Sequence, residues 1–311
     1  MVPRVAVATS GGRDSTALLH CTARQGVELG VEVHALHVHH GLMPQADAWQ
    51  AHVAAQCRRW GVAFATLRLS GAPARGDSVE AWARRGRYAA LAMMARERGI
   101  GLVLLAHHRR DQAETFLIQA LRGGGAAGLA AMPRLAQRDG VIWARPWLDQ
   151  PRSAIEAYAR RHRLAFVEDA SNDDPRFARG RLRAVVWPAL NVAFPDGEAT
   201  LARAAARAAV DAAVLAEVAA ADVAVVSVED GALAVDRWLE LSAARRVNAL
   251  RAWLGAALPE PVPETLVRRL ADELPGCQHA EWPAGAGRLR LRRRRLRFAA
   301  LGRQSGEASP A

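Results

Sequence analysis

A glycine-containing loop near the N-terminus combines residue types that bind phosphate. Ser10-Gly-Gly-Arg-Asp-Ser15 follows an apolar run over residues 4–9 and precedes an apolar helical segment that begins at Thr16. Glycines allow backbone N–H groups to converge on one point, and the following helix adds the positive end of its dipole. The loop predicts a site for a phosphate or pyrophosphate group, and an ordinary glycine-rich strand-to-helix turn is the alternative.

The loop differs from two common nucleotide-binding loops. The phosphate loop of many ATPases depends on a lysine, but all 42 basic residues of this chain are arginine. The same absence excludes Schiff-base chemistry on a lysine side chain. A dinucleotide-binding loop needs a third glycine near the helix start, where this chain has Arg13, Asp14 and Ser15. Neither of these two loop types is therefore expected.

Histidines end the second apolar run of the chain. His37 and His39 share one face of the expected strand, His40 lies at its tip, and Asp47 follows. Three interpretations stay open: histidines of the core or its rim, a nucleotide-contacting loop that includes His39, and a metal site. The metal site has the least support, because no second ligand cluster has metal-like spacing.

Two carboxylates follow the expected strand over residues 102–106. His107 and His108 end that strand, and Asp111 and Glu114 then lie one helical turn apart on a shared face. Such a pair can hold a cation, either Mg²⁺ or the ammonium group of a substrate. Acids in a first helical turn also favour the helix dipole, so a purely structural interpretation stays open.

Arginines gather in two later segments. Arg176, Arg179 and Arg183 are spaced i, i+3 and i+7, which predicts one stripe along a helix that begins near Pro175. Such a stripe suits phosphate contacts, and a solvated face paired with the preceding acids is the alternative. Residues 288–297 form the densest charge run, and their alternating leucines predict an edge strand with a basic outer face.

Strand-like and helical segments alternate through the first half of the chain. This pattern predicts an α/β fold with a parallel sheet flanked by helices on both faces. The polar clusters lie at the carboxyl ends of the expected strands, where such sheets bind ligands. The expected strands cover residues 4–9, 31–38, 63–69 and 102–106, and the expected helices cover residues 46–60, 79–98 and 111–122.

A second, smaller and mostly helical α+β domain is expected over residues 197–302, after a boundary near residues 191–197. An alanine-rich helix over residues 199–221 opens it. Residues 303–311 are small and polar and are expected to be disordered. The further expected helices cover residues 243–254 and 264–274, and the expected extended segments cover residues 233–235 and 289–298.

Composition narrows the class of protein. The 311-residue chain has no apolar run of 18 or more residues, and its start lacks a signal-peptide pattern, so we expect a cytoplasmic protein without a membrane span. Three distant cysteines give neither a disulfide framework nor a zinc site. The net charge of +11 favours a polyanionic partner, most simply nucleic acid, although an arginine-biased proteome would give the same charge.

Taken in order along the chain, these motifs resemble the tRNA(Ile)-lysidine synthetases of the PP-loop ATP-pyrophosphatase superfamily. The resemblance is strong over residues 1–190 and weaker over residues 200–300. It implies a PP-loop catalytic domain over residues 1–190 and a small tRNA-binding domain over residues 197–302. The matching motifs are Ser10–Ser15, His37-Val-His-His-Gly-Leu42 with Asp47, Glu80 with Arg84 and Arg87, His107-His108 with Asp111–Thr115, Arg122-Gly-Gly-Gly125, Arg145-Pro146 and residues 169–183.

The resemblance implies an ATP-dependent reaction on RNA. ATP adenylates the C2 oxygen of the wobble cytidine, position 34, of tRNA(Ile) with the CAU anticodon. Free L-lysine then attacks C2, which gives lysidine and changes codon reading from AUG to AUA. The implied catalytic residues are Asp14, Asp111 and Glu114, with Asp14 as the candidate Mg²⁺ ligand. The implied ATP-binding residues are Ser10, Gly11, Gly12, Arg13, Asp14, Ser15, His39 and His107. The implied tRNA-binding residues are Arg84, Arg87, Arg176, Arg179 and Arg183.

Two departures from the family pattern keep alternatives open. Arg110 stands where the family often has an acid, and Gly180 stands where it often has asparagine. A non-catalytic RNA-binding protein and a PP-loop enzyme with another nucleophile, such as ammonia, are the alternatives. Sulfur transfer is not expected, because the chain has no Cys-x-x-Cys motif. A homodimer is compatible with the sequence, which does not decide the oligomeric state.

Overall fold

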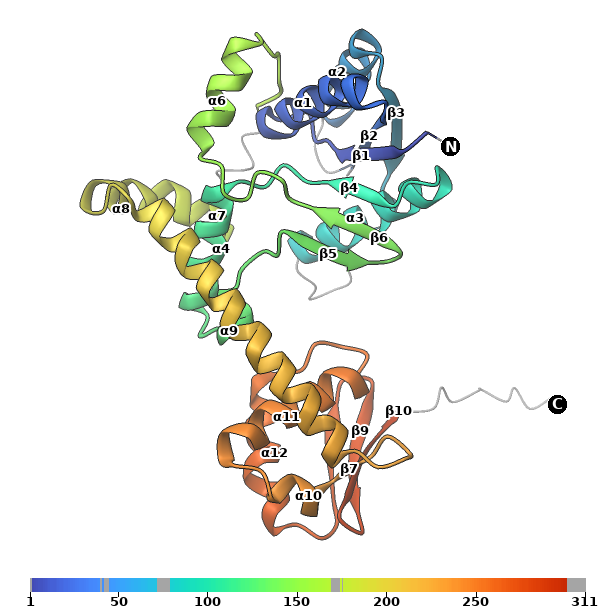
Figure 1. Ribbon diagram of the computed structural model, residues 1–311, viewed down its shortest axis with the longest axis vertical. Helices are drawn as coiled ribbons and strands as arrows, with labels where there is room; N and C mark the ends of the chain where they lie inside the picture. The colour runs from blue at the N-terminus through green and yellow to red at the C-terminus, as the bar shows by residue number, and fades with distance from the viewer. Residues whose placement is uncertain are drawn as a thin grey trace, which may run out of the picture. The chain divides into compact units, whose positions relative to one another are not determined.

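The computed structural model describes residues 2–39, 41, 45–71, 79–168, 174 and 176–300, and the side chains of residues 79–81 are not described. Within these ranges, one sheet has the strand order β3-β2-β1-β4-β6-β5 (Figure 1). Its strands are β1 (Arg4–Ala8), β2 (Glu32–His39), β3 (Ala63–Arg68), β4 (Leu102–Leu104), β5 (Leu135–Arg138) and β6 (Val141–Ala144).

Helices cover both faces of this sheet, as the alternating pattern predicts. Leu18, Leu19 and Val53 join α1 and α2 to one face, and Leu91 and Met94 join α3 to the other. The helices of this part are α1 (Arg13–Leu29), α2 (Ala46–Trp60), α3 (Val79–Glu97), α4 (Arg109–Leu121), α5 (Ala126–Leu129), α6 (Arg152–Arg161), α7 (Ala178–Arg181), a π-helical segment (Leu182–Val186) and α8 (Trp187–Ala193).

The sheet is parallel except at one edge. Strand β1 pairs in parallel with β2 and β4, and β6 pairs in parallel with β4. Strand β5 instead forms an antiparallel hairpin with β6. Asp139 and Gly140 connect the two strands with φ angles of 56° and 75°. An Asp-Gly pair adopts these positive values readily, which explains a hairpin where a crossover helix would otherwise stand.

The chain divides into two compact units, Met1–Ala209 and Val210–Ala311, inside the long helix α9 (Gly197–Val226). The boundary expected from sequence lies at residues 191–197, just before this helix. Residues 40, 169–173, 175 and 303–311, on which several predictions fall, lie outside the described residues. No helix in the described ranges is long and apolar enough to span a membrane.

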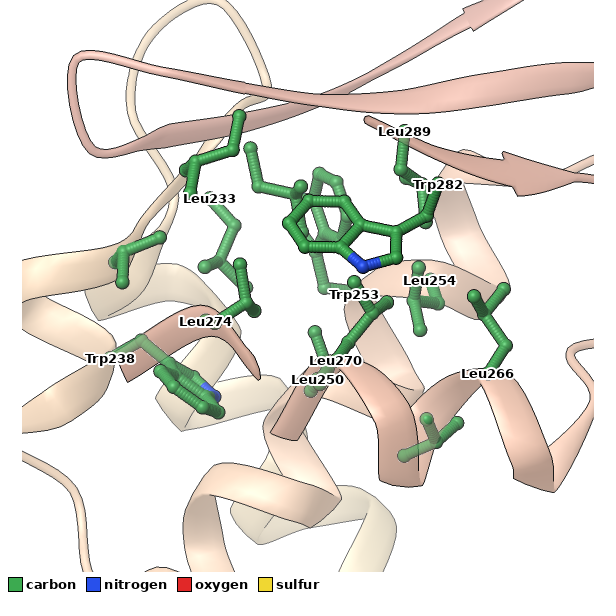
Figure 2. Close-up of a cluster of buried hydrophobic side chains, with 14 of the residues drawn as sticks. Leu233, Trp238, Leu250, Trp253, Leu254, Leu266, Leu270, Leu274, Trp282 and Leu289 are labelled. Carbon is green, nitrogen blue, oxygen red and sulfur yellow. The ribbon is translucent and has the colours of Figure 1, made fainter. Parts of the chain in front are cut away.

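The second unit has its own sheet and core. Its sheet has the order β7-β10-β9-β8, and its leucines and tryptophans pack between sheet and helices (Figure 2). Trp238 and Trp282 are each 1% exposed. The elements are β7 (Leu233–Ala234), α10 (Val235–Leu239), α11 (Ala243–Ala257), α12 (Glu264–Glu273), a 3₁₀ turn (Leu274–Gly276), β8 (Ala280–Ala284), β9 (Gly287–Arg292) and β10 (Arg295–Ala300).

The prediction of a single extended segment over residues 289–298 is wrong, because these residues belong to two strands that form a hairpin. Arg293 and Arg294 turn the chain between β9 and β10 with φ angles of 50° and 58°. The exposed arginines of β9 are partly neutralised, since Arg288 and Arg290 both contact Glu281. Strand β9 is also not an edge strand, because it lies between β10 and β8.

Candidate active site

The glycine loop connects the carboxyl end of β1 to the start of α1. Gly11 has a φ of +86°, which favours glycine, and a Cβ there would lie 3.1 Å from the Cγ2 of Val53. The Val167 N–H donates to the Gly11 carbonyl at 2.9 Å, so a segment far along the chain supports the loop. Gly12 is the N-cap of α1 and has no side-chain cap, which leaves the helix N-terminus open to a ligand.

Hydroxyl groups hold the loop in shape. The Ser10 N–H donates to the Ser15 Oγ at 3.2 Å, and the Ser15 hydroxyl donates to the Gly12 carbonyl at 3.0 Å. The Thr16 hydroxyl donates to the Gly11 carbonyl at 3.1 Å. Because these hydroxyls are occupied within the loop, its conformation is fixed before any anion binds.

The two charged residues of the loop turn to different partners. Arg13 donates to Glu156 of α6 at 2.8 Å and to Asp14 at 3.0 Å. Asp14 also lies 3.6 Å from the Nε2 of His108, which lies at the same distance from Asp111. Burial raises the pKa of Asp14, but His108 and Arg13 outweigh it and hold the pKa below its usual value. The structure thus joins the loop to the start of α4 through one histidine.

The carboxylate pair of α4 already holds a guanidinium group. Glu114, which is fully buried, accepts from the Nε and Nη2 of Arg183 at 2.8 and 2.9 Å. Asp111 accepts from the same Nη2 at 3.2 Å and from the backbone N–H of His108 at 3.0 Å. Arg179 lies 3.5 Å from Glu114 and donates to Thr115 at 2.9 Å. The pair therefore contacts two guanidinium groups of the arginine-rich segment, and its binding of Mg²⁺ or of a substrate ammonium group stays a prediction.

A second group of cations surrounds His107. The pKa of His107 is lowered to about 3, because burial and the charges of Arg145, Arg87 and Arg179 outweigh the opposing charge of Asp111. The Nδ1 of His107 is buried without a hydrogen-bond partner among the described residues. Side chains remote in sequence thus place positive charge around His107.

The pKa values of the adjacent histidines His107 and His108 are shifted in opposite directions. Burial lowers the pKa of His108, but Asp14 and Asp111 outweigh it and raise the pKa above the ordinary 6.5. His107 therefore contributes stability that is present above about pH 6.5 and is lost as the pH falls towards 3. His108 contributes stability that is present below about pH 6.5 and is lost as the pH rises through its folded pKa.

Urea unfolding from pH 5 to 9 measures both effects through variants of the two histidines. His107→Gln is expected to flatten the acid side of the stability profile, and His108→Gln the alkaline side. The limiting slope is about 1.4 kcal/mol per pH unit for one proton. Profiles that stay parallel to that of the unmodified chain would contradict the assignment.

The strand histidines lie in the core rather than in an open loop. His37 is buried and its Nδ1 lies 2.9 Å from the carbonyl oxygen of Thr9, directly before the glycine loop. His39 is 2% exposed, and its two ring nitrogens contact Asp47 and the N–H of Gly41. These bonds brace the carboxyl end of β2, and the contact of His39 with ATP stays a prediction.

The prediction that Arg176, Arg179 and Arg183 form one stripe along a helix is wrong. Helix α7 begins at Ala178, so Arg176 precedes it, is exposed and pairs with Asp174 at 2.6 Å. Arg179 and Arg183 turn inward to α4 instead. A Cβ on Gly180 would lie 2.0 Å from the carbonyl oxygen of Asp174, so this departure from the family pattern has a steric cause.

Arginines of α3 and α4 lie against aromatic rings. Arg84 and Arg87 flank the ring of Tyr88, at 5.3 and 5.9 Å from its centroid. Arg110, which stands where the family often has an acid, lies 4.8 Å from the ring of Trp187 and donates to Glu198 at 3.3 Å. The sequence carries no signal for this contact, because 88 residues separate Arg110 from Glu198.

Comparison with known families identifies the class of protein to which this fold and this loop belong. A family model described as the PP-loop domain matches residues 2–190. A solved structure, the U34-tRNA thiolase NcsA from Methanococcus maripaludis, has a similar fold, with a TM-score of 0.57 and 15% identity. The similarity covers 66% of this chain and 71% of the other, and it supports the α/β fold alone.

Curated relatives narrow the class. A tRNA(Ile)-lysidine synthase from Ralstonia nicotianae is 47% identical over 89% of this chain and 60% of its own length. One from Bordetella bronchiseptica is 44% identical over 84% of this chain and 77% of its own length. One from Burkholderia mallei is 40% identical over 99% of this chain and 64% of its own length. The chain belongs to the tRNA(Ile)-lysidine synthase family, and it spans three fifths of the Ralstonia relative.

Proposed function

We propose that this chain uses ATP to attach free lysine to C2 of the wobble cytidine of tRNA(Ile) with a CAU anticodon. The observation that carries the proposal is the pairing of a glycine loop with two carboxylates. His108 connects Asp14 of the loop to Asp111. The loop that we propose to bind an anion and the carboxylate pair that we propose to bind a cation thus lie on either side of one histidine, which would suit a nucleotide and an amine that must meet.

The residues of the loop fit the phosphates of ATP. The open N-terminus of α1 and the N–H groups of Gly11 and Gly12 supply donors, and Arg13 adds charge. Asp14 fits a Mg²⁺ ion that arrives with these phosphates, because Mg²⁺ commonly takes one or two carboxylates plus phosphate oxygens and water. Such an ion would neutralise charge on the phosphates. Among the described residues no group of three or more His, Cys, Asp or Glu side chains could hold a metal alone.

The chemistry then has two steps. The C2 oxygen of the cytidine attacks the α-phosphorus of ATP, and pyrophosphate leaves. The ε-amine of lysine attacks C2 and AMP leaves, so one C–N bond forms, one C–O bond breaks and the amine gives up a proton. Asp111 and Glu114 would bind the lysine ammonium group and take that proton. Arg183 lies on both carboxylates, so lysine must share or replace its contacts.

The remaining arginines and the second unit would bind the RNA. Arg84 and Arg87 lie on α3 and Arg179 lies on α7, and phosphates would relieve the repulsion among such cations. We assign the small domain, residues 197–302, to the anticodon stem, which it would recognise through shape and backbone.

Mass spectrometry of a tRNA(Ile) transcript tests this function. The transcript is incubated with the protein, ATP, Mg²⁺ and lysine, and the expected product carries one lysine at C34. Omission of lysine or ATP should abolish the product. A non-catalytic RNA-binding protein would bind the transcript without releasing pyrophosphate. An enzyme with another nucleophile would release pyrophosphate only when ammonia or another amine replaces lysine.

Arg176→Ala is expected to reduce the salt dependence of tRNA binding. Arg176 is exposed and its contact with Asp174 is a surface ion pair, so a phosphate can compete for it. Loss of one phosphate contact lowers the slope of log K against log salt by about 1. Arg138, which forms a similar exposed pair with Asp139, gives the matched control Arg138→Ala. Equal slopes for the two variants would make the Arg176 pair structural.

A further inference from the structure

Helix α4 is buried through a full turn where its two carboxylates lie. Residues 111–114 are all buried, so the neighbours of each side chain determine how the helix is rotated about its axis. Asp111 and Glu114 both bind the guanidinium group of Arg183. Gln112 lies roughly 160° around the helix from Glu114, because successive residues are 100° apart. Its side chain therefore emerges on the opposite side of the helix.

The carboxamide of Gln112 is bonded to one loop through both of its ends. Its oxygen accepts from the Met132 N–H at 3.0 Å, and its nitrogen donates to the Met132 carbonyl at 3.0 Å. The same nitrogen also approaches the Ala130 carbonyl at 3.4 Å. Both Gln112 and Met132 are buried. Two complementary bonds to one residue fix orientation as well as distance, and we call this pair of bonds the Gln112 clamp.

The loop that receives the clamp is itself fixed to the sheet. Arg145, which follows β6 and is buried, donates through Nη1 to the Pro133 carbonyl at 2.8 Å. The backbone N–H of Arg145 donates to the Arg134 carbonyl at 2.9 Å. Ala131 has a φ of 55°, a conformation that a residue other than glycine keeps only where its surroundings hold it. The clamp thus connects the back of α4 to the end of β6.

A glycine-rich segment turns the chain back from the end of α4 to this loop. The Gly124 N–H donates to the Gln119 carbonyl at 2.8 Å. A Cβ on Gly124 would lie 2.9 Å from that oxygen, so a side chain there must displace the backbone. Gly123 has a φ of +72°, which also favours glycine. Helix α5 then leads to Met132, so α4 and α5 form a hairpin that the Gln112 clamp closes.

We propose that Gln112 is a positioning residue for the reaction of the lysine amine, because its clamp fixes the rotation of α4 that presents Asp111 and Glu114. The inference rests on the proposed function and assigns a role to a side chain on the far side of the helix. Rotation of α4 would move both carboxylates relative to His108 and Asp14, which lie 3.6 Å apart. Misplacement of a reacting group by 1 Å can lower a rate by about 100-fold.

Gln112→Met removes the clamp, because methionine has a similar length and no amide. In the tRNA-dependent pyrophosphate-release assay we expect kcat/KM for lysine to fall about 10- to 100-fold, with a raised lysine KM and an unchanged ATP KM. Gln119→Met makes the same change two turns further along α4 and should leave both KM values unchanged. A merely structural role of Gln112 would reduce the amount of folded protein, and so kcat, without altering either KM.

Two neighbouring glycines test the hairpin by a second route. Gly124→Ala should open the hairpin and raise the lysine KM as Gln112→Met does. Gly125 has a φ of −74°, and a Cβ there would meet nothing within 4 Å, so Gly125→Ala is the matched control. Because both changes release one hairpin, the double variant Gln112→Met with Gly124→Ala should be no worse than the weaker of the two single variants. Effects that multiply would contradict this shared route.

Hydrogen exchange tests the clamp independently of lysine. The Met132 N–H should exchange more slowly in the unmodified chain than in Gln112→Met, and equal rates would show that the clamp does not form. If the unmodified chain forms no lysidine, the proposed function fails and the positioning role fails with it, while exchange at Met132 still reports the clamp. If lysidine forms but Gln112→Met and Gln119→Met share one lysine KM, only the positioning role fails. Thermal unfolding identifies a temperature at which all variants are folded.

Discussion

Glutamine in place of Glu114 is expected to remove lysidine formation and to destabilise the first unit. Glu114 is fully buried and binds Arg183 through both carboxylate oxygens. An amide cannot accept two charge-assisted bonds from one guanidinium group, so Arg183 loses its principal partner. Breaking a buried pair in this way costs about 3 kcal/mol of unfolding free energy. Loss of a group that takes a proton lowers the rate by about 10²–10⁴-fold.

A matched variant in the second unit separates stability from chemistry. Asp222 is 1% exposed and pairs with Arg245, so Asp222→Asn breaks a comparable pair. We expect Asp222→Asn to lower the free energy of unfolding, measured with urea, and to leave the lysine KM unchanged. Glu114→Gln should instead raise the lysine KM more than the ATP KM at temperatures where it is folded. Unchanged lysidine formation by folded Glu114→Gln would exclude a role for this carboxylate.

Local patterns predicted the elements of the first unit well. Apolar runs separated by amphipathic segments gave β1 to β4 and α2 to α4 nearly to their ends, because period and burial decide these elements, whereas α1 begins at Arg13, three residues before the expected Thr16. The glycine loop was also predictable, since Gly11 with its positive φ fits a strand-to-helix turn. Helix α6 and the β5–β6 hairpin were missed, although Asp139-Gly140 carries a hairpin signal.

Other features could not be derived from local sequence. Arg293 and Arg294 adopt positive φ angles without glycine or asparagine, so pairing of the flanking strands determines this turn. The spacing of Arg183 predicted a helix face, but its partner Glu114 lies 69 residues away. The contact of Arg110 with Trp187 likewise depends on how two distant segments pack. Side-chain partners across the fold are therefore the part of the site that only a structure supplies.

Alanine in place of Gly11 is expected to abolish ATP use with only a moderate loss of stability. Gly11 has a φ of +86°, a conformation that costs an L-residue about 1–2 kcal/mol. Its Cβ would also lie 3.1 Å from the Cγ2 of Val53, so the loop must shift. Converging N–H groups bind phosphate only in a fixed arrangement, and loss of such preorganised donors lowers rates by about 10²–10³-fold.

Two glycine variants show whether the effect belongs to the loop. Gly61 has a φ of +67° and open space where a Cβ would lie, so Gly61→Ala carries the backbone strain without touching the loop. Gly12 has an ordinary φ of −70°, and a Cβ there would lie 3.4 Å from the Ser10 Oγ. Gly61→Ala should lose stability and keep the ATP KM measured by pyrophosphate release, whereas Gly12→Ala should fold normally. If Gly11→Ala matches Gly61→Ala in both stability and ATP use, the loop does not hold the phosphates, because strain alone then accounts for the whole effect.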